Sequence, residues 1–158
     1  MLSRKKFIVL NATYRTADVY AYDTTIKPIE NVPIVTAATA YDDPITGTTY
    51  ILVFNEAFYY GEKLDHSLIN PNQIRDYGIP LWDNPYDVAR DLSIDVNSSF
   101  SIPLHTMGTK VGFRTRLPTS DELTACEHVH MTSSRPWNPF EVMMIQATAQ
   151  VGRTNPWK

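Results

Sequence analysis

Short apolar runs, rich in β-branched and aromatic residues, alternate along the chain with breaks at proline, glycine, asparagine and aspartate. This pattern is typical of β-strands joined by tight turns. The spacing of the runs predicts an all-β fold, a small barrel or sandwich. The predicted strands span residues 6–10, 17–22, 33–40, 48–54, 92–96, 100–104 and 110–114.

A hairpin is predicted between the third and fourth of these strands. The connecting residues 41–47 include Pro44 and Gly47. Proline fixes φ near the value that a turn needs, and glycine readily reaches positive φ. Residues 41–47 are therefore predicted to be the loop of a β-hairpin.

One short helix is predicted over about residues 71–77. Asn70 can accept a hydrogen bond from a free backbone amide as the N-cap, and Pro71 suits the first helical position. Gln73 can reach back to the N-cap as in a capping box, and Gly78 can end the helix in a left-handed conformation. A helix of two turns is too short to be stable alone, so it must pack against the sheet.

Two further patterns concern helices. Ile69 and Ile74 have the spacing of a hydrophobic staple around the N-cap of the first helix. Thr119 and Glu122 have capping-box spacing, which predicts the start of a second brief helix.

The length of the chain predicts a single core. It has 158 residues, 43% of them hydrophobic and 20% charged, which is typical of one folded domain. Residues 1–116 are predicted to form the compact β domain. Residues 117–158, with prolines at 136 and 139 and a polar end, are predicted to be an extension or an inter-domain linker.

Charge and apolar run length exclude several classes of protein. The net charge is −3 and no basic patch stands out, which argues against nucleic-acid binding by this segment. The longest apolar runs, such as residues 50–54, fall far short of the ~20 residues that a bilayer requires. The apolar stretch at residues 7–10, which follows a basic start, ends at Asn11 and is too short for a signal peptide. Cys126 is the single cysteine, so an intracellular, cytoplasmic location is expected.

Cys126, His128 and His130 are the best candidates for a metal site. On an extended strand, alternate residues lie on one face, so these three side chains would be aligned. Alternate strand positions lie about 7 Å apart, which is too far for easy chelation, and no second Cys/His pair accompanies them. The favoured interpretation is a solvated polar segment, and no metal or cofactor is expected.

Other polar clusters favour structural roles. Asp42 and Asp43 fall in the predicted hairpin loop, and Tyr59 and Tyr60 fit packing in a β segment. The sequence 23–25, Asp-Thr-Thr, differs from the Asp-Thr-Gly turn of aspartic proteases because a β-branched residue stands where the turn needs glycine. The chain contains neither a Gly-x-Ser-x-Gly turn nor a glycine-rich phosphate loop.

The order of segments between residues 23 and 78 nevertheless resembles a known family. A polar turn, a short strand at 32–35, a hairpin and a second apolar strand at 50–54 follow one another. The segments 56–60 and 64–69 then precede a short helix that ends at 77–78. The amino-acid sequences of residues 66–75, 82–85 and 137–139 add to this resemblance. Over about residues 7–142, the chain resembles the aspartic protease region of copia-type retrotransposon Gag-Pol polyproteins.

This resemblance implies a retropepsin-like fold, in which the turn before Val32 forms a flap over the substrate and residues 68–69 enter the last helix. In that family two aspartates, one from each subunit of a homodimer, share a proton and activate water. The matching Asp-Thr/Ser-Gly turn is expected to stand before Met1, so no catalytic residue is assigned and the substrate-binding residues are unknown. Val32 and Pro33 replace a common flap glycine.

The expectation is therefore a retrotransposon polyprotein fragment that resembles an aspartic endopeptidase, lacks peptidase activity as it stands and could form a homodimer. Completed, it would take an extended peptide or the polyprotein as substrate. The alternative is a non-catalytic β module that binds an extended peptide or protein partner by strand addition.

Overall fold

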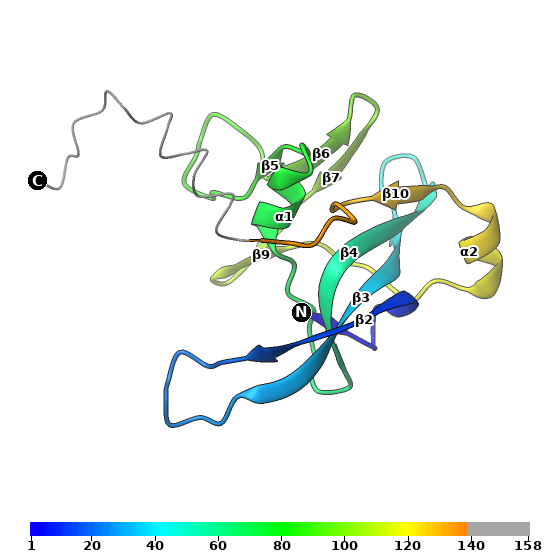
Figure 1. Cartoon of the computed structure of the whole chain (residues 1–158). Coiled ribbons are helices and arrows are strands. Elements are labelled where there is room, and N and C mark those ends of the chain that lie inside the picture. Colours follow the sequence, from blue (N-terminus) through cyan, green and yellow to red (C-terminus); the bar gives the residue numbers. More distant parts are fainter. Residues whose placement is uncertain (139–158) are drawn as a thin grey trace, which may run out of the picture.

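A computed structural model describes residues 1–138 of the chain, and β-strands dominate it (Figure 1). The strands are β1 (Leu2–Ser3), β2 (Ile8–Val19), β3 (Ile29–Asp42), β4 (Thr49–Gly61), β5 (Leu81–Trp82), β6 (Ser93–Asn97), β7 (Phe100–Pro103), β8 (His105–Met107), β9 (Lys110–Gly112) and β10 (His128–His130). The helices are α1 (Pro71–Asp76) and α2 (Ser120–Ala125). The predicted all-β class is confirmed.

The main sheet is built from three long antiparallel strands. Its order is β1-β4-β3-β2, and β10 also pairs with β4. Both β1 and β10 run parallel to β4, so the two ends of the described chain meet on the same strand. The sheet does not close into a barrel within residues 1–138, because β2 forms an edge.

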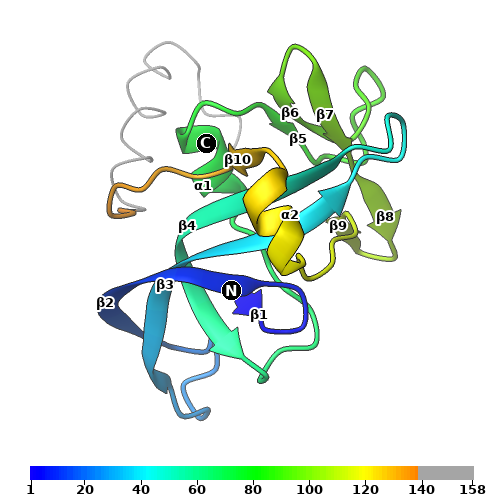
Figure 2. The same ribbon diagram turned by 90° about the vertical axis from the view of Figure 1, so that its right-hand side faces the viewer.

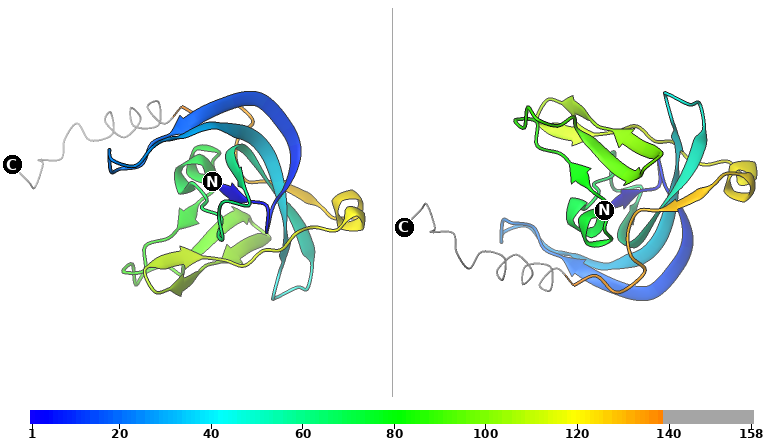
Figure 3. Two further views of the ribbon diagram at one scale, coloured as in Figure 1. Left: turned by 90° about the horizontal axis from the view of Figure 1, so that it is seen from below. Right: turned by 90° about the horizontal axis from the view of Figure 1, so that it is seen from above.

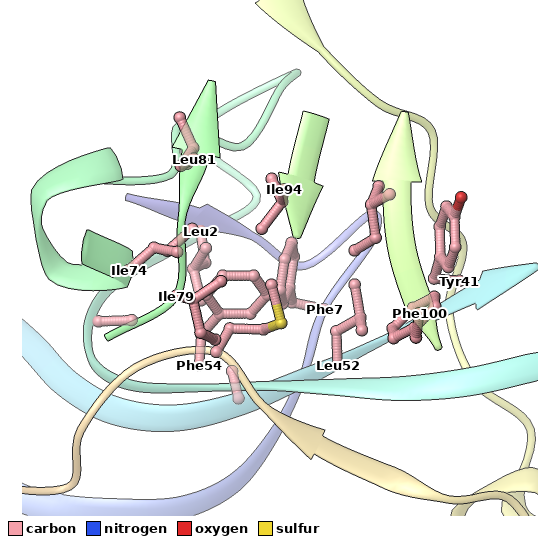
Figure 4. Close-up of a cluster of buried hydrophobic side chains, with 14 of the residues drawn as sticks. Leu2, Phe7, Tyr41, Leu52, Phe54, Ile74, Ile79, Leu81, Ile94 and Phe100 are labelled. Atoms are coloured by element: carbon pink, nitrogen blue, oxygen red, sulfur yellow. The ribbon is translucent and has the colours of Figure 1, made fainter. Parts of the chain in front are cut away.

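A second layer covers one face of the main sheet. It contains the β5-β6-β7 sheet and α1, while β8 and β9 form a separate hairpin. The main core lies between the layers, and Figure 4 shows Phe7 and Phe54 beside Ile74 and Ile79. Phe7 and Phe54 meet edge to face at 5.7 Å between ring centroids. Removing this apolar surface from water supplies the main driving force for the packing.

Helix α2 covers part of the opposite face (Figure 2). Leu123 and Cys126 of this segment pack on the buried side chains of Ala38, Ile51 and Val53. Thr119 and Glu122 form both hydrogen bonds of the predicted capping box. Part of the chain beyond residue 116 therefore belongs to the folded body.

Helix α1 confirms most of its predicted signals. The Asn70 side chain accepts a hydrogen bond from the backbone N–H of Asn72, and Pro71 occupies the first turn. Ile74 is fully buried, and Gly78 follows with a φ of +88°. Gln73 does not close a capping box, because its amide donates to the backbone carbonyl of β4 at residue 56 instead.

The strand predictions differ from the structure in extent. The predicted hairpin between β3 and β4 is confirmed, although β3 extends to Asp42, so that residues 43–48 form the connection. The strands predicted at 6–10 and 17–22 merge into β2, and the last residues of the second form a turn. The short strands β1, β5, β8 and β10 carry too few residues for an alternation to be visible in the sequence.

Residues 117–132, expected to be an extension, pack on the main sheet in the structure. His128, Val129 and His130 pair with the middle of β4, and Met131 is fully buried in the main core. The physical reason is that β4 has a vacant side that β10 fills. Residues 139–158 of the predicted extension lie outside the described residues. Within residues 1–138, no helix is both long and apolar enough to cross a membrane.

Candidate functional site

One edge of the main sheet is open along β2. This 12-residue strand pairs with β3 on one side, and no strand of residues 1–138 pairs with its other side. The outward N–H and C=O groups of an edge strand can hydrogen-bond to another extended chain. Figure 3 shows β2 and β3 curving around the body, with their connecting turn projecting beyond the rest of the described chain. Residues 8–32 are called the arm below.

Exposed apolar side chains concentrate on the arm. Half of the fourteen large apolar residues exposed in residues 1–138 lie on it, namely Ile8, Leu10, Tyr14, Tyr20, Tyr22, Ile26 and Ile29. Scattered single exposed apolar residues are normal on a protein surface, whereas a gathering of them marks a region for interaction.

The pairing of β2 with β3 shows on which face of the sheet Val9 and Ile8 lie. Val9 pairs with Ala37 and packs against the main core. Ile8 pairs with Ala38, which is buried on the opposite, α2-bearing face. Ile8 is 39% exposed, so within residues 1–138 the apolar surface of that face reaches the open edge without a cover. Leu10 is 42% exposed and lies where the register of β2 shifts between Val9 and Asn11.

Irregular positions in β2 and β4 lie where the arm joins the body. Between Ala12 and Thr16 the register of β2 shifts against β3, and Tyr14 takes a φ of +60° there. In β4, Glu56 takes a φ of +53°. A left-handed conformation at a non-glycine residue costs on the order of 1–3 kcal/mol, and surrounding contacts must hold it. Arg15 supplies such a contact, because its guanidinium donates to the carboxylate of Glu56.

Glu56 connects three parts of the chain. Its side chain is only 6% exposed, and the backbone N–H of Trp137 also donates to its carboxylate at 3.4 Å. Its carbonyl accepts the Gln73 amide at 3.1 Å, which links the same bulge to α1. A partly buried carboxylate with an arginine partner fixes geometry more than it adds stability.

A network of hydrogen bonds around Asn55, the residue before Glu56, supports this bulge. The backbone N–H of Asn55 donates to the Thr132 hydroxyl at 2.7 Å, and this hydroxyl donates back to the Asn55 carbonyl at 2.9 Å. The Asn55 amide donates to the Thr132 carbonyl at 2.9 Å and accepts from the Thr36 hydroxyl at 2.9 Å. Both Asn55 and Thr132 are buried, so these bonds satisfy groups that water does not reach.

The three candidate metal ligands do not form a metal site. Cys126 ends α2 and packs against the sheet, while His128 and His130 lie exposed on β10 with Val129 turned inward between them. His130 lies 3.3 Å from the Asn55 amide nitrogen through its Nδ1 atom. No group of three or more metal-ligating side chains occurs within residues 1–138.

The acidic pair of the hairpin loop has structural contacts. The Asp43 carboxylate accepts from the backbone N–H of Ile45, which lowers its pKa, and Asp42 bonds to Arg116, which lowers its pKa too. Arg116 also binds Glu122 at 2.6 Å and lowers the pKa of that carboxyl to about 2. Arg116 thereby ties the β3–β4 hairpin to α2.

The remaining sequence candidates lie apart from one another. Tyr60 is buried at the end of β4, where desolvation raises the pKa of its hydroxyl, and Tyr59 packs at the rim of the core. Asp23 lies in the turn of the arm, and the backbone N–H and hydroxyl of Thr25 donate to its carboxylate. These bonds lower the pKa of Asp23. The arm therefore carries the turn that was compared with a protease motif.

A shallow depression of about 250 Å³ lies beside β5. The Arg90 guanidinium stands 3.9 Å from the ring centroid of Trp82 there, and Arg75 pairs with Asp83 at 2.7 Å. The Trp82 indole N–H donates to Asp95 at 2.9 Å. The charges that line the depression are balanced, and it gives no clear preference for a ligand.

Sequence reasoning missed the open edge because it placed two strands where β2 is continuous. A signal was present, since residues 11–16 contain β-forming threonine and tyrosine and neither glycine nor proline. The ion pair between Arg15 and Glu56 could not be predicted from the sequence, because the two residues lie 41 positions apart.

Comparisons with protein-family models, with curated proteins and with solved structures find no match to this chain.

Proposed function

We propose that this protein is a β module that binds an extended peptide or protein partner by adding it as a strand to β2. The observation that carries the proposal is the long edge of β2, which has no partner strand within residues 1–138, beside a concentration of exposed apolar side chains. Main-chain hydrogen bonds would supply affinity, and side chains at alternate positions of the partner would supply specificity.

The arm suits this role because its edge is already ordered. The Arg15–Glu56 pair and the bonds of Asn55 hold the bulges that shape the strand. On binding, only the added segment would then lose conformational entropy, because the edge of β2 is already fixed. This lowers the free-energy cost of association. Ile8 and Leu10 would lie beside the part of the added strand that pairs with the start of β2.

Backbone methylation of a peptide tests strand addition directly. A library of ten-residue extended peptides is first screened by fluorescence anisotropy for a binder. Two versions of the binder are then N-methylated at alternate residues, one set on each edge. Only one version should lose binding, because only one edge of the peptide donates to β2. Equal binding by both versions, or no binder at all, would contradict the proposal.

Variants locate the site. Leu10→Lys should weaken the binder, whereas Val88→Lys, which also places a lysine at an exposed apolar position but off the arm, should not. Amide chemical shifts in residues 8–19 should change on binding. Shifts confined to the depression beside β5 would place the ligand elsewhere and reject the β2 edge as the site.

We infer as a second candidate the retropepsin-like interpretation, in which this chain is part of a retrotransposon polyprotein. It is supported by the projecting β2–β3 hairpin, which would be the flap in this interpretation, and by α1, which begins at Pro71 just after residues 68–69. The sequence contains no Asp-Thr-Gly or Asp-Ser-Gly turn, so the chain alone is predicted to lack peptidase activity. Pepstatin-sensitive cleavage of a peptide library at mildly acidic pH by purified 1–158 would contradict this prediction.

A further inference from the structure

Charge differs between the two ends of the arm. The root of the arm is the part of the chain just before β2 together with the turn after β4 that it contacts, where the backbone N–H of Arg4 donates to the Gly61 carbonyl. Four cations and two carboxylates lie at this root: Arg4, Lys5, Lys6, Lys63, Glu62 and Asp65. Lys5 and Lys6 lead directly into β2, whereas residues 62–65 follow β4. Arg4 pairs with Glu62 at 3.1 Å and Lys5 with Asp65 at 2.5 Å. Lys6 and Lys63 form no ion pair within residues 1–138, so the root keeps an excess of positive charge.

The tip of the arm has the opposite sign. Asp18, Asp23 and Glu30 lie at or near the turn, with Lys27 as the one cation among residues 16–32. Asp18 accepts from the backbone N–H of Asn31 at 2.9 Å, which holds its carboxylate near the tip. The hydrogen bonds from Thr25 favour the ionised form of Asp23. The tip is therefore negative at neutral pH.

The two ends act separately on a bound segment. A 12-residue strand spans about 40 Å, several times the Debye length of about 8 Å at physiological salt. Each end therefore interacts with the part of the ligand that lies next to it. An added strand running antiparallel to β2 would place its carboxyl end at the positive root and its amino end at the negative tip. A parallel strand would reverse both contacts.

We propose that the partner of β2 is an antiparallel segment with basic residues at its amino end, acidic residues at its carboxyl end and apolar residues at alternate positions between them. The apolar residues would lie beside the exposed side chains of Ile8 and Leu10. This inference rests on the proposed strand addition at β2 and adds the direction and the charge pattern of the partner.

Two peptides of identical composition test the inference. Both have twelve residues, blocked ends and the same alternating apolar centre. One carries two lysines at its amino end and two glutamates at its carboxyl end, and the other carries these residues exchanged. At low salt the first should bind about tenfold more tightly, since opposite charges on neighbouring strands attract and like charges repel. The difference should shrink to less than about twofold at 0.5 M salt.

Charge exchange in the protein provides the matched test. The double variant Lys6→Glu and Glu30→Lys should lose or invert the preference between the two peptides. Lys110→Glu changes a lysine on the β8–β9 hairpin, off the arm, and should leave the preference intact. Circular dichroism verifies that each variant is folded.

The outcomes separate the two proposals. Equal affinity for both peptides at low salt would overturn the charge inference and leave strand addition standing. If neither peptide binds the folded protein, the proposed peptide-binding function is overturned together with the inference. A dimer in sedimentation experiments that neither peptide dissociates would also overturn the inference, because a second copy would then occupy the edge.

Discussion

Truncating Met131 to alanine tests whether the chain beyond residue 116 is an integral part of the fold. Met131 is fully buried in the main core, and its backbone N–H donates to the Val53 carbonyl at 2.8 Å. Replacing a fully buried methionine by alanine removes apolar contacts and leaves a cavity, which typically costs about 2–5 kcal/mol. In a chain of this size each kcal/mol lowers Tm by about 2–4 °C. Met131→Ala should therefore lower Tm by about 5–15 °C.

Urea unfolding followed by circular dichroism measures the change in the free energy of unfolding. Leu117→Ala is the control from the same segment, and because Leu117 is 47% exposed it should cost less than about 1 kcal/mol. Amide exchange gives a second measurement. The N–H of Ile51, which donates to the Glu127 carbonyl at 2.9 Å, should exchange faster in Met131→Ala. A Met131→Ala protein as stable as the control would refute the packing of residues 117–132 on the sheet.

Three other substitutions probe the bulges and the Arg116 bridge. Thr132→Val leaves the buried N–H and C=O of Asn55 without their hydroxyl partner and should cost roughly 2 kcal/mol or more, measured by urea unfolding. Tyr14→Gly should raise stability by about 1 kcal/mol, since Tyr14 is 97% exposed and only its φ of +60° opposes the fold. Glu122→Gln should reduce the dependence of Tm on pH between about 4.5 and about 2. The folded state lowers the pKa of Glu122, so the stability from its pair with Arg116 is present above the unfolded pKa and is lost as pH falls through the folded pKa.

Each of these predictions has a result that would contradict it. Thr132→Ser keeps the hydroxyl and should be clearly more stable than Thr132→Val, so equal losses would exclude the hydrogen bonds as the cause. A destabilised Tyr14→Gly would mean that the tyrosine side chain holds the bulge. An unchanged acid transition in Glu122→Gln would exclude the Arg116 pair as a source of the pH dependence.

Local structure was predictable wherever the sequence contains its own stop and start signals. The N-cap Asn70, the following Pro71 and Gly78 define α1, and Thr119 with Glu122 defines the start of α2. Each signal acts within a few residues, because capping joins a side chain to a backbone group close by. The hairpin loop at 41–47 belongs to the same class.

Features that depend on distant partners were not predictable. Gln73 has the spacing for a capping box, yet its amide donates to the carbonyl of Glu56 on β4. Strand β10 contains only three residues, and it exists because β4 offers a vacant side. The open edge depends on β2 continuing through a bulge at Tyr14. Tyr14 has a positive φ although it is not a glycine, so the sequence gives no signal of the bulge. Tertiary contacts decide all three cases.

The place of β4 at the centre of the main sheet has a consequence for folding. It pairs with Leu2 and Ser3 near the start of the described chain and with residues 128–130 near its end. Closing these parallel pairings requires ordering more than fifty residues of intervening chain on one side and more than seventy on the other. Loop-closure entropy of this kind slows folding, so acquisition of the native state should be slow for a protein of this size. On the ribosome, the sheet stays incomplete until almost all of residues 1–138 have emerged.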